Sequence, residues 1–124
     1  MEQAPVPIIS QRFDCAICDK EAATISLFGS ESGATCTVYG FIGEMRAGVA
    51  LSEFKDVLGA LKTKDVVSLF AIDFEFAPFY CPKCKVSYCK NHWSYWFVDD
   101  EELPHMYDCT KGRCPEGHER MLID

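Results

Sequence analysis

Cysteine and histidine residues at short spacings are the part of this sequence best able to do chemistry. Two cysteines separated by two residues form a tight turn that holds both thiolates near one ion, and zinc prefers four nitrogen or sulfur ligands in a tetrahedron. The chain has four such pairs, which combine in twos, so the sequence predicts two structural Zn²⁺ ions per chain. The predicted ligands are Cys15 and Cys18, Cys81 and Cys84, Cys89 and His92, and two of Cys109, Cys114 and His118.

The last of these pairs has one candidate too many. Cys114 begins the turn-compatible segment Cys-Pro-Glu-Gly-His and is a predicted ligand in either case. The four-residue gap between Cys109 and Cys114 is common in zinc loops and favours Cys109, while His118 stays open as the alternative. Two other residues are not predicted to be ligands. His105 is expected on the surface, and Cys36 is expected to be a small packed side chain within a strand.

Other chemistries of paired thiols fit the sequence less well. A redox-active C-x2-C pair would open a helix in a βαβ unit, and neither pair has that context. A catalytic zinc keeps one position open for water, whereas four protein groups can fill each site here. We therefore predict a zinc-binding protein without enzymatic activity. The alternative is a zinc-dependent hydrolase with an open site near Cys114 and His118, and Glu116 or Glu119 would assist hydrolysis there.

The spacing of the central ligands resembles the middle of the AN1-type zinc finger. Cys81-x2-Cys84-x4-Cys89-x2-His92 is similar to that family's C-x(1–2)-C-x4-C-x2-H segment. The family holds two zinc ions in a cross-brace, in which the first pair shares an ion with the third pair and the second with the fourth. The resemblance implies one zinc on Cys15, Cys18, Cys89 and His92, and another on Cys81, Cys84 and the C-terminal pair, in a cross-brace or treble-clef-like arrangement.

The strands that must position these ligands are predicted from local composition. Residues 1–12 are expected to be an extended lead-in. Residues 23–28 and 34–42 are predicted to pair as a hairpin around the turn at 29–33, and residues 46–51 form a weaker strand.

The clearest predicted helix begins at Ser52, which is placed to cap its first turn. Residues 65–76 are predicted to form a short helix that passes into an extended segment near Asp73. The apolar stripe of the first helix follows the spacing i, i+3, i+4 and i+7, at Phe54, Val57, Leu58 and Leu61.

These elements together predict an α+β fold, a small zinc-stabilised domain in which two structural zinc sites hold an inserted β-hairpin and helix. The chain is expected to be a single zinc-binding domain over residues 1–124. Its α/β insert covers about 23–76, and its Cys/His-rich C-terminal part covers 79–124. Both ends of the chain therefore contribute ligands.

Charge and cysteine chemistry limit the partners and the location. The 124 residues include 12 basic and 19 acidic side chains, and the net charge of −7 argues against a nucleic-acid partner. By elimination we predict a protein-protein interaction module, with its oligomeric state left open. Residues 1–7 have no signal-peptide character, and no segment is apolar enough to span a membrane. A cytoplasmic location, where thiols stay reduced, is therefore predicted.

Two features next to the ligands could also contact a partner. The aromatic residues within 93–97 are predicted to pack over the zinc sites rather than to stack on single-stranded nucleic acid, because stacking surfaces normally lie in basic grooves. The acidic residues 99–102 are predicted to be a solvated loop, and a docking patch for a basic partner is the less favoured interpretation.

Overall fold

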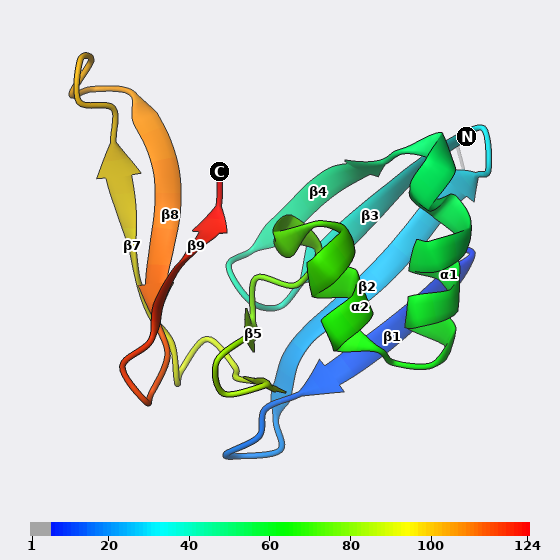
Figure 1. The fold of residues 1–124 in the computed structure, drawn as a ribbon, viewed down its shortest axis with the longest axis horizontal. Helices are drawn as coiled ribbons and strands as arrows, with labels where there is room; N and C mark the ends of the chain where they lie inside the picture. The colour runs from blue at the N-terminus through cyan, green and yellow to red at the C-terminus, as the bar shows by residue number, and fades with distance from the viewer. Residues whose placement is uncertain (1–5) are drawn as a thin grey trace, which may run out of the picture.

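Three antiparallel sheets and two short helices make up residues 6–124, the part of the chain that the computed structural model describes (Figure 1). The predictions for residues 1–5, an extended lead-in without signal-peptide character, lie outside the described residues. The four-stranded sheet has the order β1-β2-β3-β4 and consists of β1 (Ile9–Asp14), β2 (Glu21–Ser30), β3 (Gly33–Tyr39) and β4 (Glu44–Val49).

Helices follow this sheet, and two smaller sheets complete the chain. The helical segments are η1 (Leu51–Glu53), α1 (Phe54–Lys62), α2 (Val66–Ile72) and η2 (Phe74–Phe76), of which η1 and η2 are 3₁₀ turns. The smaller sheets are β5 (Tyr80–Cys81) with β6 (Val86–Ser87), and β7 (Ser94–Asp99), β8 (Tyr107–Arg113) and β9 (Glu119–Ile123) in that order.

Alternating side chains give the four-stranded sheet one buried face. Ile25 in β2 lies opposite Val38 in β3, and both are at most 2% exposed. The end of β2 next to the turn requires glycine, because Gly29 has a φ of +99° and an added Cβ would lie 2.1 Å from a backbone carbonyl oxygen. The predicted hairpin is therefore present, and β2 is longer than expected. The lead-in also differs from the prediction, since β1 pairs with β2 and extends the sheet.

Helices α1 and α2 cover the buried face of this sheet (Figure 1). Phe54, Val57 and Leu61 of the predicted apolar stripe are buried. The prediction that Ser52 caps this helix is wrong, because Ser52 lies within η1 and Glu53 holds the N-cap position of α1.

Helix α2 begins at a well-defined cap and ends at an extended residue. The side chain of Asp65 accepts a hydrogen bond from the backbone N–H of Ser68 at 3.1 Å. Asp73 ends the helix in an extended conformation, as predicted, but the chain then forms η2 instead of continuing as a strand.

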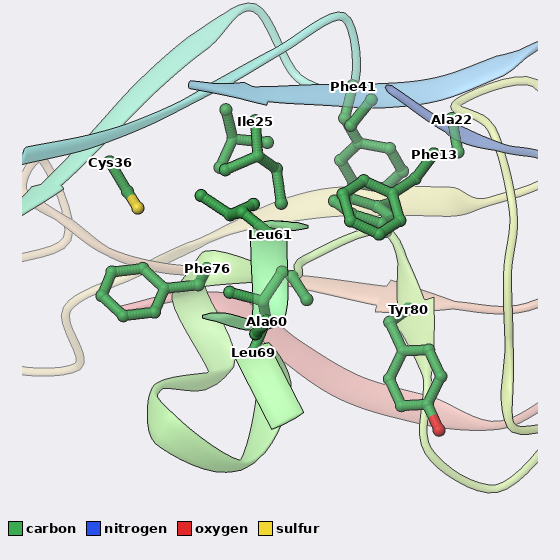
Figure 2. Packing of buried hydrophobic residues seen from close by; sticks show 14 of the residues in the cluster. Phe13, Ala22, Ile25, Cys36, Phe41, Ala60, Leu61, Leu69, Phe76 and Tyr80 are labelled. Atoms are coloured by element: carbon green, nitrogen blue, oxygen red, sulfur yellow. The ribbon is translucent and has the colours of Figure 1, made fainter. Parts of the chain in front are cut away.

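The hydrophobic core lies between the helices and the four-stranded sheet (Figure 2). Ile25, Leu61 and Leu69 are each 0% exposed. Burial of a side chain of this size contributes about 1.5–3 kcal/mol. The rings of Phe13 and Phe79, with centroids 5.5 Å apart, extend the core from β1 toward the segment that carries the second pair of cysteines.

The three-stranded sheet is joined to the rest of the molecule near the end of β9 and the start of β7. Leu122 in β9 is 0% exposed and packs against Gly112 in β8, where an added Cβ would lie 2.6 Å from a Leu122 methyl carbon. The indole N–H of Trp93 donates to the carbonyl oxygen of Phe79 at 3.0 Å. The far ends of β7 and β8 extend away from the four-stranded sheet (Figure 1).

A half-buried arginine strengthens this connection. The guanidinium of Arg120 donates hydrogen bonds to the carbonyl oxygens of Ala77 at 3.0 Å and Tyr80 at 2.6 Å. It also lies 4.9 Å from the centre of the Phe70 ring. Burial lowers the pKa of Arg120 to about 10, so the side chain remains charged at neutral pH and ties β9 to the chain before β5.

The α+β class is confirmed, but the elements are more extensive than the sequence predicted. The insert contains the predicted hairpin, the weaker third strand and two helices, and the addition that was not predicted is β1, which joins them in a four-stranded sheet. The three-stranded sheet within 94–123 was not predicted, because the polar and aromatic residues there do not alternate as apolar and polar residues usually do in a strand.

Candidate metal centre

Two clusters of three cysteines and one histidine lie in the molecule. In the first cluster, the ligand atoms of Cys15, Cys18, Cys89 and His92 all lie within 4.8 Å of one another. The sulfur of Cys89 lies 3.2 Å from Nδ1 of His92 and 3.7 Å from the sulfur of Cys18. The sulfur of Cys15 lies 3.4 Å from the same ring nitrogen.

The second cluster repeats this arrangement with Cys81, Cys84, Cys114 and His118, again within 4.8 Å of one another. Nδ1 of His118 lies 3.3 Å from the sulfur of Cys84 and 3.4 Å from the sulfur of Cys114. The sulfurs of Cys84 and Cys114 are 3.7 Å apart. Each cluster therefore offers three thiol groups and one imidazole nitrogen at a common centre.

The spacing of these atoms fits a tetrahedral zinc ion. With Zn–S bonds of about 2.3 Å and Zn–N bonds of about 2.0–2.1 Å, tetrahedral geometry puts two sulfurs about 3.8 Å apart and a sulfur and a nitrogen about 3.6 Å apart. The distances given above run from 3.2 to 3.7 Å. The donor set is also one that zinc prefers, so both clusters could hold a metal ion with little movement.

Two local turns explain how each C-x2-C pair brings its sulfurs together. In both, the residue after the second cysteine has a left-handed backbone, with φ of 59° at Asp19 and at Lys85. Its backbone N–H donates to the carbonyl oxygen of the first cysteine, at 3.0 Å from Asp19 to Cys15 and 2.7 Å from Lys85 to Cys81. Backbone N–H groups also donate to the sulfurs of Cys15 and Cys81, each at 3.4 Å.

The β8–β9 turn supplies the last two ligands in a similar way. Gly117, with a φ of +89°, allows the chain to reverse between Cys114 and His118. The backbone N–H of Cys114 donates to the carbonyl oxygen of His118 at 3.0 Å, and the N–H of His118 donates to the sulfur of Cys114 at 3.4 Å. The spacing of these two ligands is therefore set by a hairpin turn.

Each cluster joins two turns that are far apart in the sequence. The first joins the β1–β2 turn to the segment between β6 and β7, and the second joins the β5–β6 turn to the β8–β9 turn. A backbone hydrogen bond of 2.9 Å from Ala16 to Ser87 in β6 holds the β1–β2 turn beside Cys89. The first pair thus lies with the third and the second with the C-terminal pair, which is the order that the AN1-type resemblance implied.

The electrostatics of the clusters favour a bound cation. Burial raises the pKa of Cys15, but backbone N–H groups of Cys18, Cys89 and Ile17 outweigh it and lower that pKa to about 6. The hydrogen bond from Tyr88 lowers the pKa of Cys84, whereas burial and the neighbouring thiols raise it, to about 11. Cys15 of the first cluster can thus ionise easily while Cys84 of the second resists, and a cation in either cluster would remove the repulsion between thiolates.

Tyr88 is a contributor that the sequence did not reveal. Burial and the neighbouring thiol of Cys84 raise the pKa of Tyr88, and its ring packs edge-on against Trp93 with centroids 6.3 Å apart. Groups that contact metal ligands from outside orient those ligands and tune their charge. A tyrosine beside a cysteine has no characteristic spacing, so no sequence signal points to this role.

Cys109 belongs to neither cluster, and His118 occupies the position for which the spacing favoured Cys109. Val98 pairs with Cys109 in the ladder between β7 and β8, and this position lies within the strand rather than at its end. The thiol of Cys109 is buried and free. The gap from Cys109 to Cys114 is spanned by extended strand, which carries the sulfur away from the turn. Cys36 is a packed strand residue and His105 is exposed, as predicted.

The aromatic residues within 93–97 divide between core and surface. Trp93 is 4% exposed and packs beside Phe41, as predicted for the whole run. For the other three aromatic residues the prediction of core packing is wrong, because Tyr95, Trp96 and Phe97 are 40%, 38% and 64% exposed.

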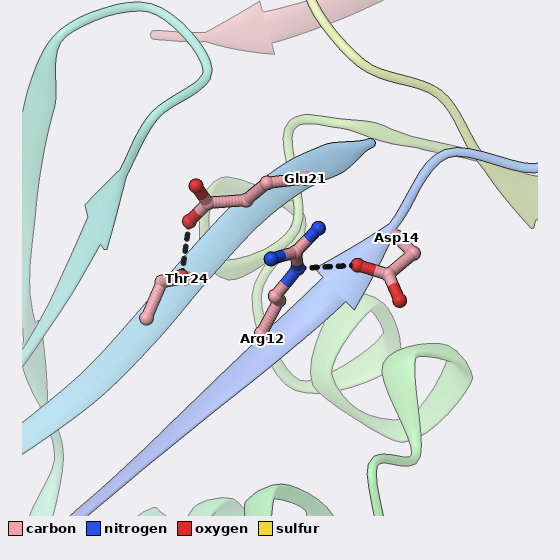
Figure 3. A network of polar contacts seen from close by, with 4 residues as sticks. All are labelled: Arg12, Asp14, Glu21 and Thr24. Carbon is pink, nitrogen blue, oxygen red and sulfur yellow. Dashed lines mark hydrogen bonds and ion pairs between the residues drawn. The ribbon is translucent and has the colours of Figure 1, made fainter. Parts of the chain in front are cut away.

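Polar pairs flank the first cluster without joining it (Figure 3). The Nε–H of Arg12 donates to Asp14 at 2.6 Å, and the hydroxyl of Thr24 donates to the carboxylate of Glu21. Asp14 ends β1 and Glu21 begins β2, so the pairs lie on either side of the ligand turn. They are exposed, and exposed ion pairs contribute little to stability. Neither carboxylate belongs to the cluster.

The fold and its clusters define a small α+β protein with two Cys₃His sites that could hold metal ions. Residues 7–124 match the family model described as "Domain of unknown function (DUF8328)", and the chain belongs to this family. The model is not that of the AN1-type zinc finger, so the resemblance extends only to ligand order. No curated protein and no solved structure matches the chain. Within residues 6–124, every helix is too short or too polar to cross a membrane.

Proposed function

We propose that the protein binds two Zn²⁺ ions as structural centres, each held by three thiolates and the Nδ1 atom of one histidine. The observation that carries this proposal is the pair of four-ligand clusters, whose interatomic distances match the edges of a tetrahedral zinc site. When bound, zinc would neutralise the thiolates and add its binding free energy to that of folding.

We propose further that the protein is not an enzyme. In a catalytic zinc site, water holds the position that a fourth protein ligand occupies here. The alternative of a hydrolase near Cys114 and His118 is less well supported, because Cys81 and Cys84 complete a set of four protein ligands with them. Glu116 is exposed, and the carboxylate of Glu119 is bonded to Arg113.

Binding to another protein is the role that we propose for the zinc-supported fold. The support is the three-stranded sheet, where exposed aromatic side chains adjoin an acidic loop. We propose a cytoplasmic location, because thiol ligands persist where disulfides do not form. All eight cysteines are free thiols in the structure.

Metal analysis and cobalt substitution test the proposal together. Protein purified without chelator is expected to contain two zinc ions per chain, one for each cluster. The cobalt form is expected to show the intense visible bands of tetrahedral thiolate ligation, unchanged when azide or cyanate is added. One ion or none would contradict the two centres. Two ions with anion-sensitive bands would instead support an open, catalytic site.

A further inference from the structure

β7 leaves one edge of the three-stranded sheet without a strand partner among the described residues. The order β7-β8-β9 gives β7 one hydrogen-bonded neighbour, and Figure 1 shows it at the outer margin of the molecule, away from the four-stranded sheet. Its sequence, Ser94–Asp99, contains neither the proline nor the lysine with which proteins commonly block such edges. An edge of this kind offers N–H and C=O groups at alternate residues to a further strand.

Apolar side chains gather around this edge. Of the twelve large hydrophobic side chains that are exposed among the described residues, seven lie in the three-stranded sheet or its β7–β8 loop. Tyr95 and Phe97 point to one face, with ring centroids 6.2 Å apart, and Tyr107 continues the row at 6.1 Å from Phe97. We call Tyr95, Phe97 and Tyr107 the aromatic row. Exposed apolar surface at this density marks a binding site more often than chance.

The loop at the end of the edge is strongly acidic. Residues 99–108, which we call the acidic tip, carry five acidic side chains and neither lysine nor arginine. Residues 101–108 are all exposed. The carboxylate of Asp100 accepts backbone hydrogen bonds from Glu102 and Leu103 at 2.9 and 3.0 Å and thereby shapes the tip. The side chains of Glu101 and Glu102 remain available to a cationic partner.

We propose that the β7 edge, the aromatic row and the acidic tip form a docking site for an extended basic segment of a partner protein, which adds to the sheet as a further strand. This inference rests on the proposed role in protein binding and names the partner's chemistry. Apolar side chains at alternate positions of the segment contact the aromatic row, and lysine or arginine residues at one end contact the acidic tip.

Charge favours a peptide over the other possible occupants. A second copy of the chain would bring its own net charge of −7 and a second acidic tip to the same edge. Two Cys₃His zinc sites would lower each net charge further, to about −9. Phosphate groups of a nucleic acid would be repelled for the same reason. A basic segment gains attraction at the tip and backbone hydrogen bonds at the edge.

The experiment begins with the zinc-loaded chain as bait for a displayed library of random peptides of about ten residues. Selection is expected to enrich sequences with apolar residues at alternate positions next to a cluster of lysine or arginine. The enriched peptide is then synthesised, and its affinity is measured by calorimetry. Affinity is expected to fall as salt concentration rises.

Backbone methylation of the peptide tests strand addition directly. In a strand added at an edge, only every second residue of the incoming segment bonds to β7. Two forms of the peptide are made, one with N-methyl groups at the odd positions and one at the even positions. One form is expected to lose binding about tenfold or more, while the other keeps it. Equal effects of both patterns would overturn strand addition.

Variants of the protein locate the site. Phe97→Ser, at 64% exposure, is expected to weaken peptide binding about 30-fold, whereas the control Val67→Ser, at 56% exposure on α2, leaves it unchanged. Glu101→Gln combined with Glu102→Gln is expected to weaken binding about threefold to tenfold and to reduce its salt dependence. Each variant should still contain two zinc ions, which separates loss of the site from loss of the fold.

The remaining outcomes also give a definite answer. Peptides that bind Phe97→Ser as well as the original chain would overturn this site but leave a protein-binding role in place. Absence of enriched peptides would count against both, with zinc content as the separate test of the metal centres. Self-association in sedimentation, or binding of oligothymidylate, that Phe97→Ser abolishes would overturn the proposal in favour of a second copy or a nucleic acid.

Discussion

In the four-stranded sheet, α1 and α2 cover one face, whereas in the three-stranded sheet β7 exposes aromatic side chains on both faces. Ile25 and Leu27 of β2 are 0% exposed, but Trp96 and Phe97, which point to opposite faces of β7, are 38% and 64% exposed. The first sheet is therefore held by apolar packing along its length. The second is held near one end and leaves much of its apolar surface exposed.

The two clusters reflect this difference. The first cluster lies at the β1–β2 turn of a sheet that already has a core of its own, while the second lies at the β8–β9 turn of a sheet that has little. Both clusters lie next to the β5–β6 hairpin. This hairpin carries Cys81 and Cys84 of the second cluster, and its residue Ser87 is hydrogen-bonded to the β1–β2 turn of the first. Metal binding is thus expected to matter more for the three-stranded sheet.

Removal of metal should give the largest effect. Structural zinc in small domains contributes about 10–16 kcal/mol at neutral pH, which is as large as the stability of a whole domain. In excess chelator, amide hydrogens in β7–β9 are expected to lose protection first, followed by those of β2 and β3. Hydrogen exchange followed by mass spectrometry checks this order. Protection of β7–β9 that survives complete loss of metal would contradict a structural role for zinc.

Cysteine variants should each remove half of the metal. Cys15→Ser and Cys89→Ser are expected to lose the same zinc ion, singly or together, because both sulfurs lie in the first cluster. Cys15→Ser with Cys84→Ser is expected to lose both ions. The measurement is zinc content of the soluble variants.

A matched pair of variants tests the identity of the last ligand. Cys114→Ser is expected to leave one zinc ion per chain, whereas Cys109→Ser, also buried but outside both clusters, is expected to leave two. Loss of zinc in Cys109→Ser would show that the strand position, and not His118, completes the site.

Packing at the base of the three-stranded sheet should have a moderate effect. Leu122→Ala removes a side chain that is 0% exposed and is expected to lower the free energy of unfolding by about 2–5 kcal/mol. Its neighbour Met121, at 38% exposure, serves as control, and Met121→Ala should cost less than about 0.5 kcal/mol. Urea denaturation of both variants measures the difference. Equal values would mean that β9 is not anchored by Leu122.

The smallest effect concerns Cys36, in the core of the four-stranded sheet. Burial raises the pKa of its thiol to about 12, against an ordinary value of 9.0. The pKa of this thiol is higher in the folded than in the unfolded state. Its contribution to the free energy of unfolding is therefore fully present below pH 9 and is lost as the pH rises toward 12. Between neutral pH and about pH 10, the original chain should therefore lose about 1 kcal/mol more of its free energy of unfolding than Cys36→Ala does. Parallel pH profiles would contradict this.

The sequence predicted best what is local. The C-x2-C turns, the hairpin around Gly29 and the stripe of α1 follow from neighbouring residues, and all are present in the structure. Strand β1 was not predicted because its mixed composition does not favour a strand, and it forms one only by pairing with β2. The AN1-type resemblance, carried by the spacing from Cys81 to His92, indicated which pairs lie together.

The choice between Cys109 and His118 could not be made from spacing alone. It depends on whether the chain before Cys114 is a loop or a strand, and residues 107–113 have little of the usual strand composition. The exposure of Phe97 could not be predicted from the sequence either. A phenylalanine is buried more often than not, and only the three-dimensional structure shows that this one is exposed.

Zinc K-edge X-ray absorption of the purified protein tests most directly whether both clusters are closed Cys₃His centres. The predicted result is four ligands for the average zinc ion, three sulfurs at about 2.3 Å and one imidazole nitrogen at about 2.0–2.1 Å, without an oxygen shell. An average of three and a half sulfurs would place Cys109 in one site. A water or carboxylate oxygen in the first shell would contradict closed structural centres.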